Sequence, residues 1–270
     1  MAGLNQLLQS VKLPVMPEVA YALIRTLKDE DADILRVRDV IAKDPALTTT
    51  LLRMANSALF GLSKSVTTLE QAISLVGLNQ VRVRALSICM SQVFALPAGI
   101  NRLAFWRDSM RCAGYARWLG VARGFDEHQA WLTAMMLRLG ELIIVQADPA
   151  FIPELEALPC APGERWERER RLCGFDEGQV TAEIARRWDF PDSMILALDA
   201  TAQPLHSETF SELGAMVHLA TLLGDGPEVT VERLGELPQE LVHKLSLNLL
   251  WMSIHLPDAS AFTDISMLQA

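Results

Sequence analysis

The side chains best suited to metal or redox chemistry are five histidines and four cysteines, spread over 270 residues. They are His128, His206, His218, His243 and His255, with Cys89, Cys112, Cys160 and Cys173. Metal sites built on one element usually pair histidines three to five residues apart, or cysteines as C-x-x-C. Neither spacing occurs here, so the sequence predicts no bound metal and no redox dithiol, and it favours buried, reduced thiols.

Motifs of the common enzyme classes are missing as well. The chain has no G-x-x-x-x-G-K-[ST] phosphate loop, no G-x-S-x-G elbow, no H-E-x-x-H pair and no G-x-G-x-x-G after a strand. The motifs therefore predict no cofactor and no catalytic residue.

Arginines gather between Gln71 and Phe125, a segment in which Asp108 is the only acid. Arg107 and Arg111 are one turn apart on one predicted helix face, and with Arg117 they are candidates for binding phosphates or an acidic partner. The alternative is that these arginines pair with acids of the same chain. The charges permit this. Residues 1–125 contain 15 Lys and Arg and 9 Asp and Glu, whereas residues 126–270 contain 9 Lys and Arg and 24 Asp and Glu, so the net charge of the chain is −9.

Size and composition indicate a folded protein with a sizeable core. Hydrophobic residues make up 50% of the chain and charged residues 21%. The apolar runs "ELIIVQA" and "LNLLWMSIHL" are shorter than the roughly 20 residues that span a bilayer, so no membrane helix is predicted. The N-terminal residues do not resemble a secretion signal, and a cytoplasmic location is expected.

Apolar spacing and helix punctuation predict an all-α fold. One helix should open at Asp44 and Pro45 and close at Gly61, and a second should begin with a capping box of Thr67 and Glu70. The predicted bounds of the first three helices are 44–61, 67–77 and 79–97, with Asn79 as a cap and Pro97 as the end of the third. A fourth covers 102–120. The alternation in "VRVRAL" is absorbed by a longer helical pattern, so no strand is predicted.

The proline and glycine of Leu96–Ile100 suggest a boundary between two helical bundles. The predicted ranges are 1–97 for an N-terminal bundle, 98–230 for a second bundle and 231–270 for a C-terminal extension. Within the second range, "ERWERERRL" carries acids and bases at helical spacing, which is typical of a solvated helix surface.

Several longer segments resemble the HD-related output domain (HDOD), a bacterial signalling module. They are "LPVMPEVAYALIRTLKDEDADILRVRDVIAKDPALTTTLLRMANSALFG", "QAISLVGLNQVR", "FWRDSMRCAGYARWLG", "AWLTAMMLRLGELII", "CGFDEGQVTAEIARRWDFP" and "MVHLATLLG". The resemblance covers roughly residues 13–224 and implies an all-α fold related to HD phosphohydrolases. It implies a second bundle that is a degenerate form of the HD domain.

In an active HD domain, His and Asp side chains from separate helices hold divalent ions that activate water. Carried onto this chain, the first histidine position falls at Asp108 and the His-Asp pair at Leu137 and Arg138. A later histidine falls at Glu177 and the final aspartate near Thr221. Leu137 cannot ligate a metal and Arg138 repels one, while two carboxylates are too few for a closed coordination sphere.

The resemblance therefore predicts that the metal site is lost. Leu137 should pack with Met135, Met136 and Leu139, and Arg138 should pair with an acid such as Asp108 or Glu177, turning a metal site into an ion-pair cluster.

The resulting expectation is a non-catalytic signalling protein that acts as a scaffold for another protein. The alternative is a nucleotide-binding or residual phosphodiesterase function, in which the arginine segment receives phosphates. A cyclic dinucleotide stays open as a ligand, although no motif supports it. The pI of about 5.1 and the lack of a recognition module argue against nucleic-acid binding. Neither the partner nor the oligomeric state follows from the sequence.

Overall fold

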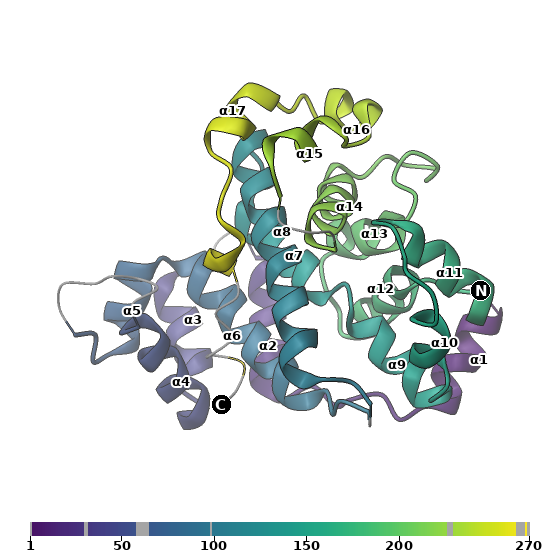
Figure 1. Ribbon diagram of the computed structural model, residues 1–270. Helices are drawn as coiled ribbons and strands as arrows, with labels where there is room; N and C mark the ends of the chain where they lie inside the picture. Colours follow the sequence, from purple (N-terminus) through teal and green to yellow (C-terminus); the bar gives the residue numbers. More distant parts are fainter. Residues whose placement is uncertain are drawn as a thin grey trace. The chain divides into compact units, whose positions relative to one another are not determined.

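The computed structural model describes residues 2–29, 32–57, 65–97, 99–225, 229–262 and 268, which form helices and turns with no β-strand (Figure 1). The predicted all-α class is confirmed. Residue contacts divide the chain into two compact units, each treated separately below. The small unit takes Pro14–Ala95, Arg187–Pro191 and Ile265–Ala270, and the large unit takes Met1–Leu13, Leu96–Arg186 and Asp192–Asp264. These units interleave along the sequence, whereas the predicted ranges 1–97, 98–230 and 231–270 are consecutive; as domains those ranges stay a prediction.

The small unit is built from five consecutive helices. They are α2 (Glu18–Leu27), α3 (Ile34–Ile41), α4 (Pro45–Ala55), α5 (Leu69–Val76) and α6 (Leu78–Val93). The start of α4 is as predicted: the Asp44 carboxylate accepts hydrogen bonds from the backbone N–H groups of Ala46 and Leu47, both at 3.0 Å. The described helix ends at Ala55, and the predicted end at Gly61 lies outside the described residues.

The capping box of α5 lies one residue later than predicted. Thr68, and not Thr67, accepts a hydrogen bond from the backbone N–H of Gln71 at 3.2 Å, and the Gln71 side chain accepts from Thr68 in return. Glu70 instead accepts from Arg38 on α3 at 3.0 Å. The physical reason is that glutamine completes the box as well as glutamate does, so the spacing alone left two registers.

The third predicted helix also has different ends. Gly77, with φ of 101°, directly precedes α6, so Asn79 lies inside the helix and accepts from Arg82 at 2.7 Å instead of capping the backbone. The helix ends at Val93, four residues before Pro97. Proline limits how far a helix extends but does not require the helix to reach it.

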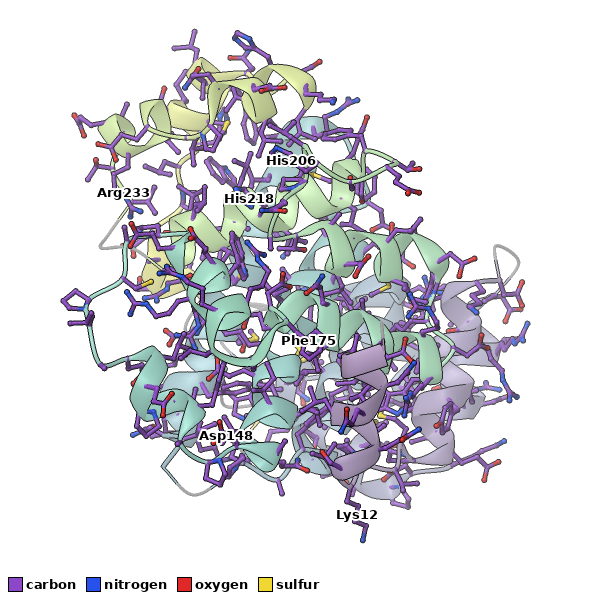
Figure 2. All side chains as sticks on the ribbon, turned by 90° about the vertical axis from the view of Figure 1, so that its right-hand side faces the viewer. Lys12, Asp148, Phe175, His206, His218 and Arg233 are labelled. Atoms are coloured by element: carbon purple, nitrogen blue, oxygen red, sulfur yellow. The ribbon has the colours of Figure 1, made fainter. Side chains whose placement is uncertain are left out.

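The large unit is organised around α7, whose 22 residues pack along α8 and α14. Its helices are α1 (Ala2–Ser10), α7 (Arg102–Arg123), α8 (Glu127–Met136), α9 (Leu139–Ala147), α10 (Phe151–Leu155), α11 (Glu164–Cys173), α12 (Glu177–Arg187), α13 (Asp192–Ala200), α14 (Glu212–Gly224), α15 (Val231–Gly235), α16 (Gln239–Lys244) and α17 (Leu249–Ile254), with the 3-10 turn Ala259–Phe262. Asn101 caps the start of α7 by accepting from Ala104, and Gly124 ends it in the left-handed conformation with φ of 72°. Figure 2 shows Phe175 beside α1, where a Cβ atom added to Gly3 would lie 3.0 Å from its ring.

One helical stretch among the described residues, Glu127–Ala147, is long and apolar enough to cross a membrane by length and composition. It is longer than the apolar runs considered in the sequence. However, 83% of its most apolar window is buried inside the fold, as is usual for a core helix. The stretch comprises α8 and α9, which a turn at Leu137 and Arg138 separates.

That turn is fixed by a close approach between α9 and α12. The backbone N–H of Gly140 donates to the Thr181 hydroxyl at 2.8 Å, and this hydroxyl donates to the carbonyl of Leu137 at 2.7 Å. A Cβ atom added to Gly140 would lie 2.2 Å from the carbonyl oxygen of Glu177. Only glycine therefore allows α9 and α12 to bring residues 138, 141 and 177 together.

We expect Gly140→Ala to lower the free energy of unfolding by about 2 kcal/mol or more, because the backbone of α12 must move to admit the methyl group. Gly235→Ala is the matched control, since an added Cβ there meets nothing within 4 Å. It should be neutral, or stabilising by up to about 1 kcal/mol. Urea unfolding followed by circular dichroism measures both, and equal effects would contradict the close approach.

Candidate functional site

The turn between α8 and α9 holds a buried guanidinium. The Arg138 side chain is 13% exposed and forms an ion pair with Asp225, which directly follows α14. Burial lowers the pKa of Arg138, but Asp225 and then Glu177 outweigh this effect and raise it well above its usual value. Arg138 does pair with an acid, as predicted, but the direct partner is Asp225 and not Asp108 or Glu177, the acids named as examples. The reason is tertiary, because the end of α14 brings Asp225 closer to the guanidinium than either predicted acid.

A second guanidinium, that of Arg165 on α11, holds two carboxylates of the same cluster. Its Nη2 lies 2.6 Å from Glu141 on α9, and its Nε lies 3.2 Å from Glu169 on α11. Glu141, Glu169 and Glu177 have carboxylate oxygens that all lie within 4.8 Å of one another. We call Arg138, Arg165, Asp225 and these three glutamates the ion-pair cluster.

Glu177 is a fully buried acid of the ion-pair cluster for which the described residues show no ion pair. One of its oxygens accepts from the Trp166 indole at 3.2 Å, and the other has no hydrogen-bond partner among the described residues. Its backbone N–H donates to the Glu169 carboxylate at 2.8 Å. Burial raises the pKa of Glu177 to about 7, although Arg138 and Arg165 act to lower it. Burial and the charge of Glu177 likewise raise the pKa of Glu169.

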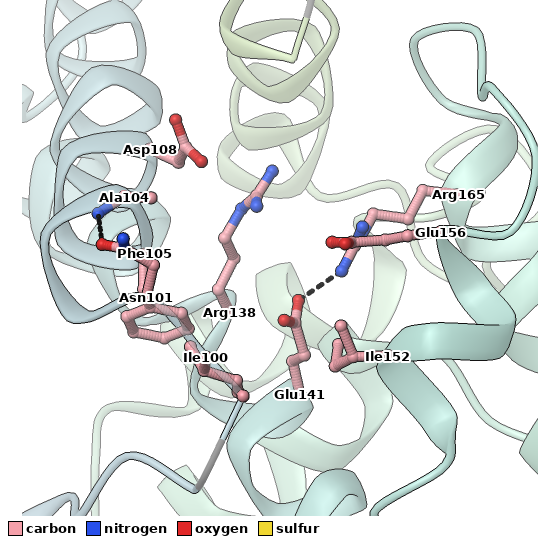
Figure 3. A pocket seen from close by; sticks show the side chains of 11 residues that line it. Ile100, Asn101, Ala104, Phe105, Asp108, Arg138, Glu141, Ile152, Glu156 and Arg165 are labelled. Atoms are coloured by element: carbon pink, nitrogen blue, oxygen red, sulfur yellow. Dashed lines mark hydrogen bonds and ion pairs between the residues drawn. The ribbon is translucent and has the colours of Figure 1, made fainter.

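A cavity of about 220 Å³ opens onto the ion-pair cluster. Figure 3 shows Arg138 projecting into this cavity between Asp108 and the Glu141–Arg165 pair. Glu156 lines the cavity too, and Asp108 pairs with Arg111 at 3.0 Å. The lining thus combines two guanidiniums with three carboxylates.

The other two residues predicted as degenerate HD positions, Leu137 and Thr221, are buried in the core. Leu137 is buried with Met135, Met136 and Leu139, as the sequence predicted. Thr221 is also buried, and its hydroxyl donates to the carbonyl of Val217 at 3.0 Å and lies 3.3 Å from the Cys112 sulfur.

These residues fit a divalent ion poorly. At the positions of the HD pair, Leu137 offers no lone pair and Arg138 places a positive charge where the ion would lie. The Glu141, Glu169 and Glu177 group has the oxygens that magnesium or manganese prefers, but the guanidinium of Arg165 already binds the first two. The cluster is arranged around resident cations of the protein itself.

The sequence reasoning missed Glu141, Arg165, Glu169 and Asp225. It also placed "ERWERERRL" on a solvated surface, which is wrong for half of α11, because Glu169 is fully buried and Trp166 is 2% exposed. Arg171 and Glu167 do lie on the exposed face, 3.6 Å apart. The available signal was Trp166, a large apolar residue within the charged run, flanked by Arg165 and, three residues later, Glu169.

Trp166, whose indole donates to Glu177, also contacts a histidine. His218 on α14, labelled in Figure 2, stacks on Trp166 with ring centroids 4.9 Å apart, and its Nδ1 lies 2.8 Å from the carbonyl of Thr201. Burial lowers the pKa of His218, which favours the neutral ring. With the Nδ1 proton donated to that carbonyl, the ring has a structural role.

Most of the arginine segment on α7 is engaged within the large unit. Arg117 pairs with Glu127 at 2.9 Å and Arg123 with Glu212 at 3.2 Å, in addition to the Arg111–Asp108 pair. Arg107 is exposed and has no ion-pair partner among the residues that the structure describes. The observed pairs are of the kind that the intrachain alternative predicts.

A family model for the HDOD domain matches residues 13–204. The chain belongs to the HDOD family. A relative from Treponema pallidum, an uncharacterized protein, is 24% identical over 190 residues; the match covers 68% of this chain but only 36% of the relative. The chain therefore spans about a third of that relative's length.

Solved structures share the fold at low sequence identity. A candidate phosphohydrolase from Shewanella amazonensis has a TM-score of 0.80 at 22% identity, covering 99% of this HDOD chain and 98% of its own. An HDOD domain protein of unknown function from Geobacter sulfurreducens has a TM-score of 0.76 at 20% identity, covering 91% and 88%. A candidate signal transduction protein from Marinobacter aquaeolei has a TM-score of 0.77 at 19% identity, covering 100% and 66%. At these identities the likeness concerns the fold alone.

We expect Arg138→Met to cost about 3–5 kcal/mol of unfolding free energy, because it leaves Asp225 as an unpaired and largely buried charge. Asp225→Asn should also lower the free energy of unfolding. The loss in the double variant should be about 1–3 kcal/mol smaller than the sum of the losses in the two single variants. Arg186→Met is the control, since Arg186 pairs with Glu183 while 56% exposed, and should cost no more than about 1 kcal/mol. Additive effects in the double variant would show that Arg138 and Asp225 are not coupled.

The raised pKa of Glu177 predicts a pH dependence of stability. Between the usual glutamate value of 4.5 and the folded value of about 7, the native state binds a proton that the unfolded chain releases, so stability should fall as pH rises through this window. One proton corresponds to at most about 1.4 kcal/mol per pH unit. Glu177→Gln should flatten the slope measured by urea unfolding from pH 4.5 to 7, whereas Glu167→Gln, at an exposed site, should leave it unchanged. An unaltered slope in Glu177→Gln would assign the titration to another group.

Proposed function

We propose that this HDOD chain is a non-catalytic signal-transduction protein that acts by binding other proteins. The observation that carries the proposal is the buried Arg138–Asp225 ion pair. The HDOD resemblance puts Arg138 at a position of the His-Asp pair of metal ligands. A guanidinium there supplies a positive charge permanently, and a divalent ion brought beside it would be repelled in a poorly hydrated site. The fold likeness to the Marinobacter protein described as a signal transduction candidate supports the signalling role.

A nucleotide-binding or residual phosphodiesterase function is the second candidate. The fold likeness to the Shewanella candidate phosphohydrolase and the guanidiniums of Arg138 and Arg165 in the cavity favour it. Both guanidiniums already hold ion pairs, however, and Asp108, Glu141 and Glu156 line the same cavity. A phosphate would have to displace a buried carboxylate and then lie beside it, which makes a phosphate ligand, including a cyclic dinucleotide, the weaker proposal.

The arginine segment offers limited room for an acidic partner. Of Arg107, Arg111 and Arg117, the latter two form ion pairs within the large unit. Arg107 is therefore the candidate with an uncommitted charge among these three, and a single exposed charge contributes about 1 kcal/mol or less. The partner-binding surface is better sought elsewhere.

We expect the purified full chain to hold no stoichiometric divalent metal by elemental analysis, because neither the HD positions nor the glutamates offer an open coordination site. With added Mg²⁺, Mn²⁺ or Fe²⁺ it should hydrolyse neither bis(p-nitrophenyl) phosphate nor a cyclic dinucleotide. One equivalent of retained iron, manganese or zinc, with hydrolysis that disappears in Asp108→Ala, would establish the enzymatic alternative instead.

A further inference from the structure

The outer face of α13 exposes a large apolar side chain beside a groove. Leu196 is 54% exposed, and the groove of about 250 Å³ next to it is also lined by Phe125, Phe210 and Leu213. Phe125 follows the end of α7, while Phe210 and Leu213 flank the start of α14. We call this site the α13 groove. Its volume suits one large apolar side chain better than a drug-sized ligand.

Close packing of α13 on α14 keeps Leu196 turned outward. A Cβ atom added to Gly214 would lie 2.9 Å from the carbonyl oxygen of Ala197, so the two helix backbones are in near contact at the residue after Leu196. Residues 192, 193, 196 and 199 form the opposite, exposed face of α13. Leu196 therefore cannot reach the core without unpacking α13, and its apolar surface remains available.

The surroundings of the α13 groove are acidic. From Trp188 to Glu232 the chain contains eight acids and no lysine or arginine. Among these acids, Asp192, Asp199 and Glu208 are exposed and have no ion-pair partner among the described residues.

Arg123 and Lys244, which lie next to residues of the α13 groove, are already engaged. Arg123 pairs with Glu212 at 3.2 Å, and the Lys244 ammonium lies 4.4 Å from the centre of the Phe210 ring. The acidic rim therefore keeps its negative charge, which would repel an acidic ligand and attract a basic one.

We propose that the α13 groove binds a basic amphipathic helix of a partner protein. One large apolar side chain of that helix inserts beside Leu196, and flanking lysines or arginines meet Asp192, Asp199 and Glu208. An apolar anchor within an oppositely charged rim is a common way for a helix to bind a surface groove. This assignment rests on the proposed protein-binding function and names its surface and the chemistry of its partner.

The test uses the full chain and a fluorescent 14-residue peptide of leucine and lysine at amphipathic helical spacing. Fluorescence anisotropy should show binding that weakens as salt rises, and amide chemical shifts of the ¹⁵N-labelled protein should change at α13 and the start of α14. Leu196→Ser should weaken binding about tenfold. The triple variant Asp192→Asn, Asp199→Asn and Glu208→Gln should remove most of the salt dependence while leaving the melting temperature unchanged.

Matched controls separate the α13 groove from general stickiness. Leu250→Ser removes another leucine, 70% exposed, and should leave the affinity unchanged. A peptide with alanine in place of leucine keeps the charge, and one with glutamate in place of lysine keeps the apolar face; both should bind at least about tenfold more weakly.

The assignment would be overturned if Leu196→Ser and Leu250→Ser lowered the affinity for the peptide equally. It would also be overturned if the glutamate peptide bound as tightly as the leucine and lysine peptide. Self-association of the chain that Leu196→Ser abolishes would assign the α13 groove to a second copy and also overturn it. These outcomes leave the proposed function standing, because that proposal fails on metal retention and hydrolysis.

Discussion

The burial of the Arg138 charge is the constraint on which the rest of the site depends. A guanidinium that is 13% exposed must be paired, since an unpaired buried charge would cost several kcal/mol. Asp225 provides the direct pair, and Glu177 and Glu141 add to the field that holds the charge. This requirement ties the α8–α9 turn to the end of α14 and to α12. Those elements share a charged centre that the protein itself supplies.

The cluster also carries more acids than cations. Asp225, Glu141, Glu169 and Glu177 face Arg138 and Arg165, so full ionisation would leave two negative charges in a region with little water. Protonation of a buried carboxyl is the less costly solution, and the raised pKa values of Glu177 and Glu169 have this cause. The excess negative charge of the cluster is thus reduced by its two guanidiniums and by protons on its buried glutamates.

Charge is distributed in the same way on a larger scale. The chain changes from net positive to net negative near Phe125, and α7 contributes arginines that meet acids from beyond that point, as in Arg117–Glu127 and Arg123–Glu212. These ion pairs neutralise much of the positive charge on the surface of α7. The acids of α13 have no corresponding arginines within their own segment, and so the large unit presents an acidic surface around Leu196.

Local signals in the sequence determined the helical class and the start of α4. Each depends on neighbours within a few residues, as in the carboxylate of Asp44 capping the two residues after Pro45. Of the positions that the HDOD resemblance named, Asp108 and Arg138 line one cavity. Local spacing predicted the wrong residue where two capping boxes were nearly equally favourable, as for Thr67 and Thr68 at the start of α5.

Only the tertiary structure decided which charges meet. Asp225 lies 87 residues from Arg138, and Arg165 lies 24 residues from Glu141, so no helical spacing connects them. The burial of Glu169 within a highly charged run likewise follows from tertiary contacts, such as the hydrogen bond that its carboxylate accepts from the backbone of Glu177 on α12. Ion pairs act over a few ångströms of space, whereas sequence patterns report neighbours along one element. The sequence therefore determined that Arg138 needs an anion, and the fold chose Asp225.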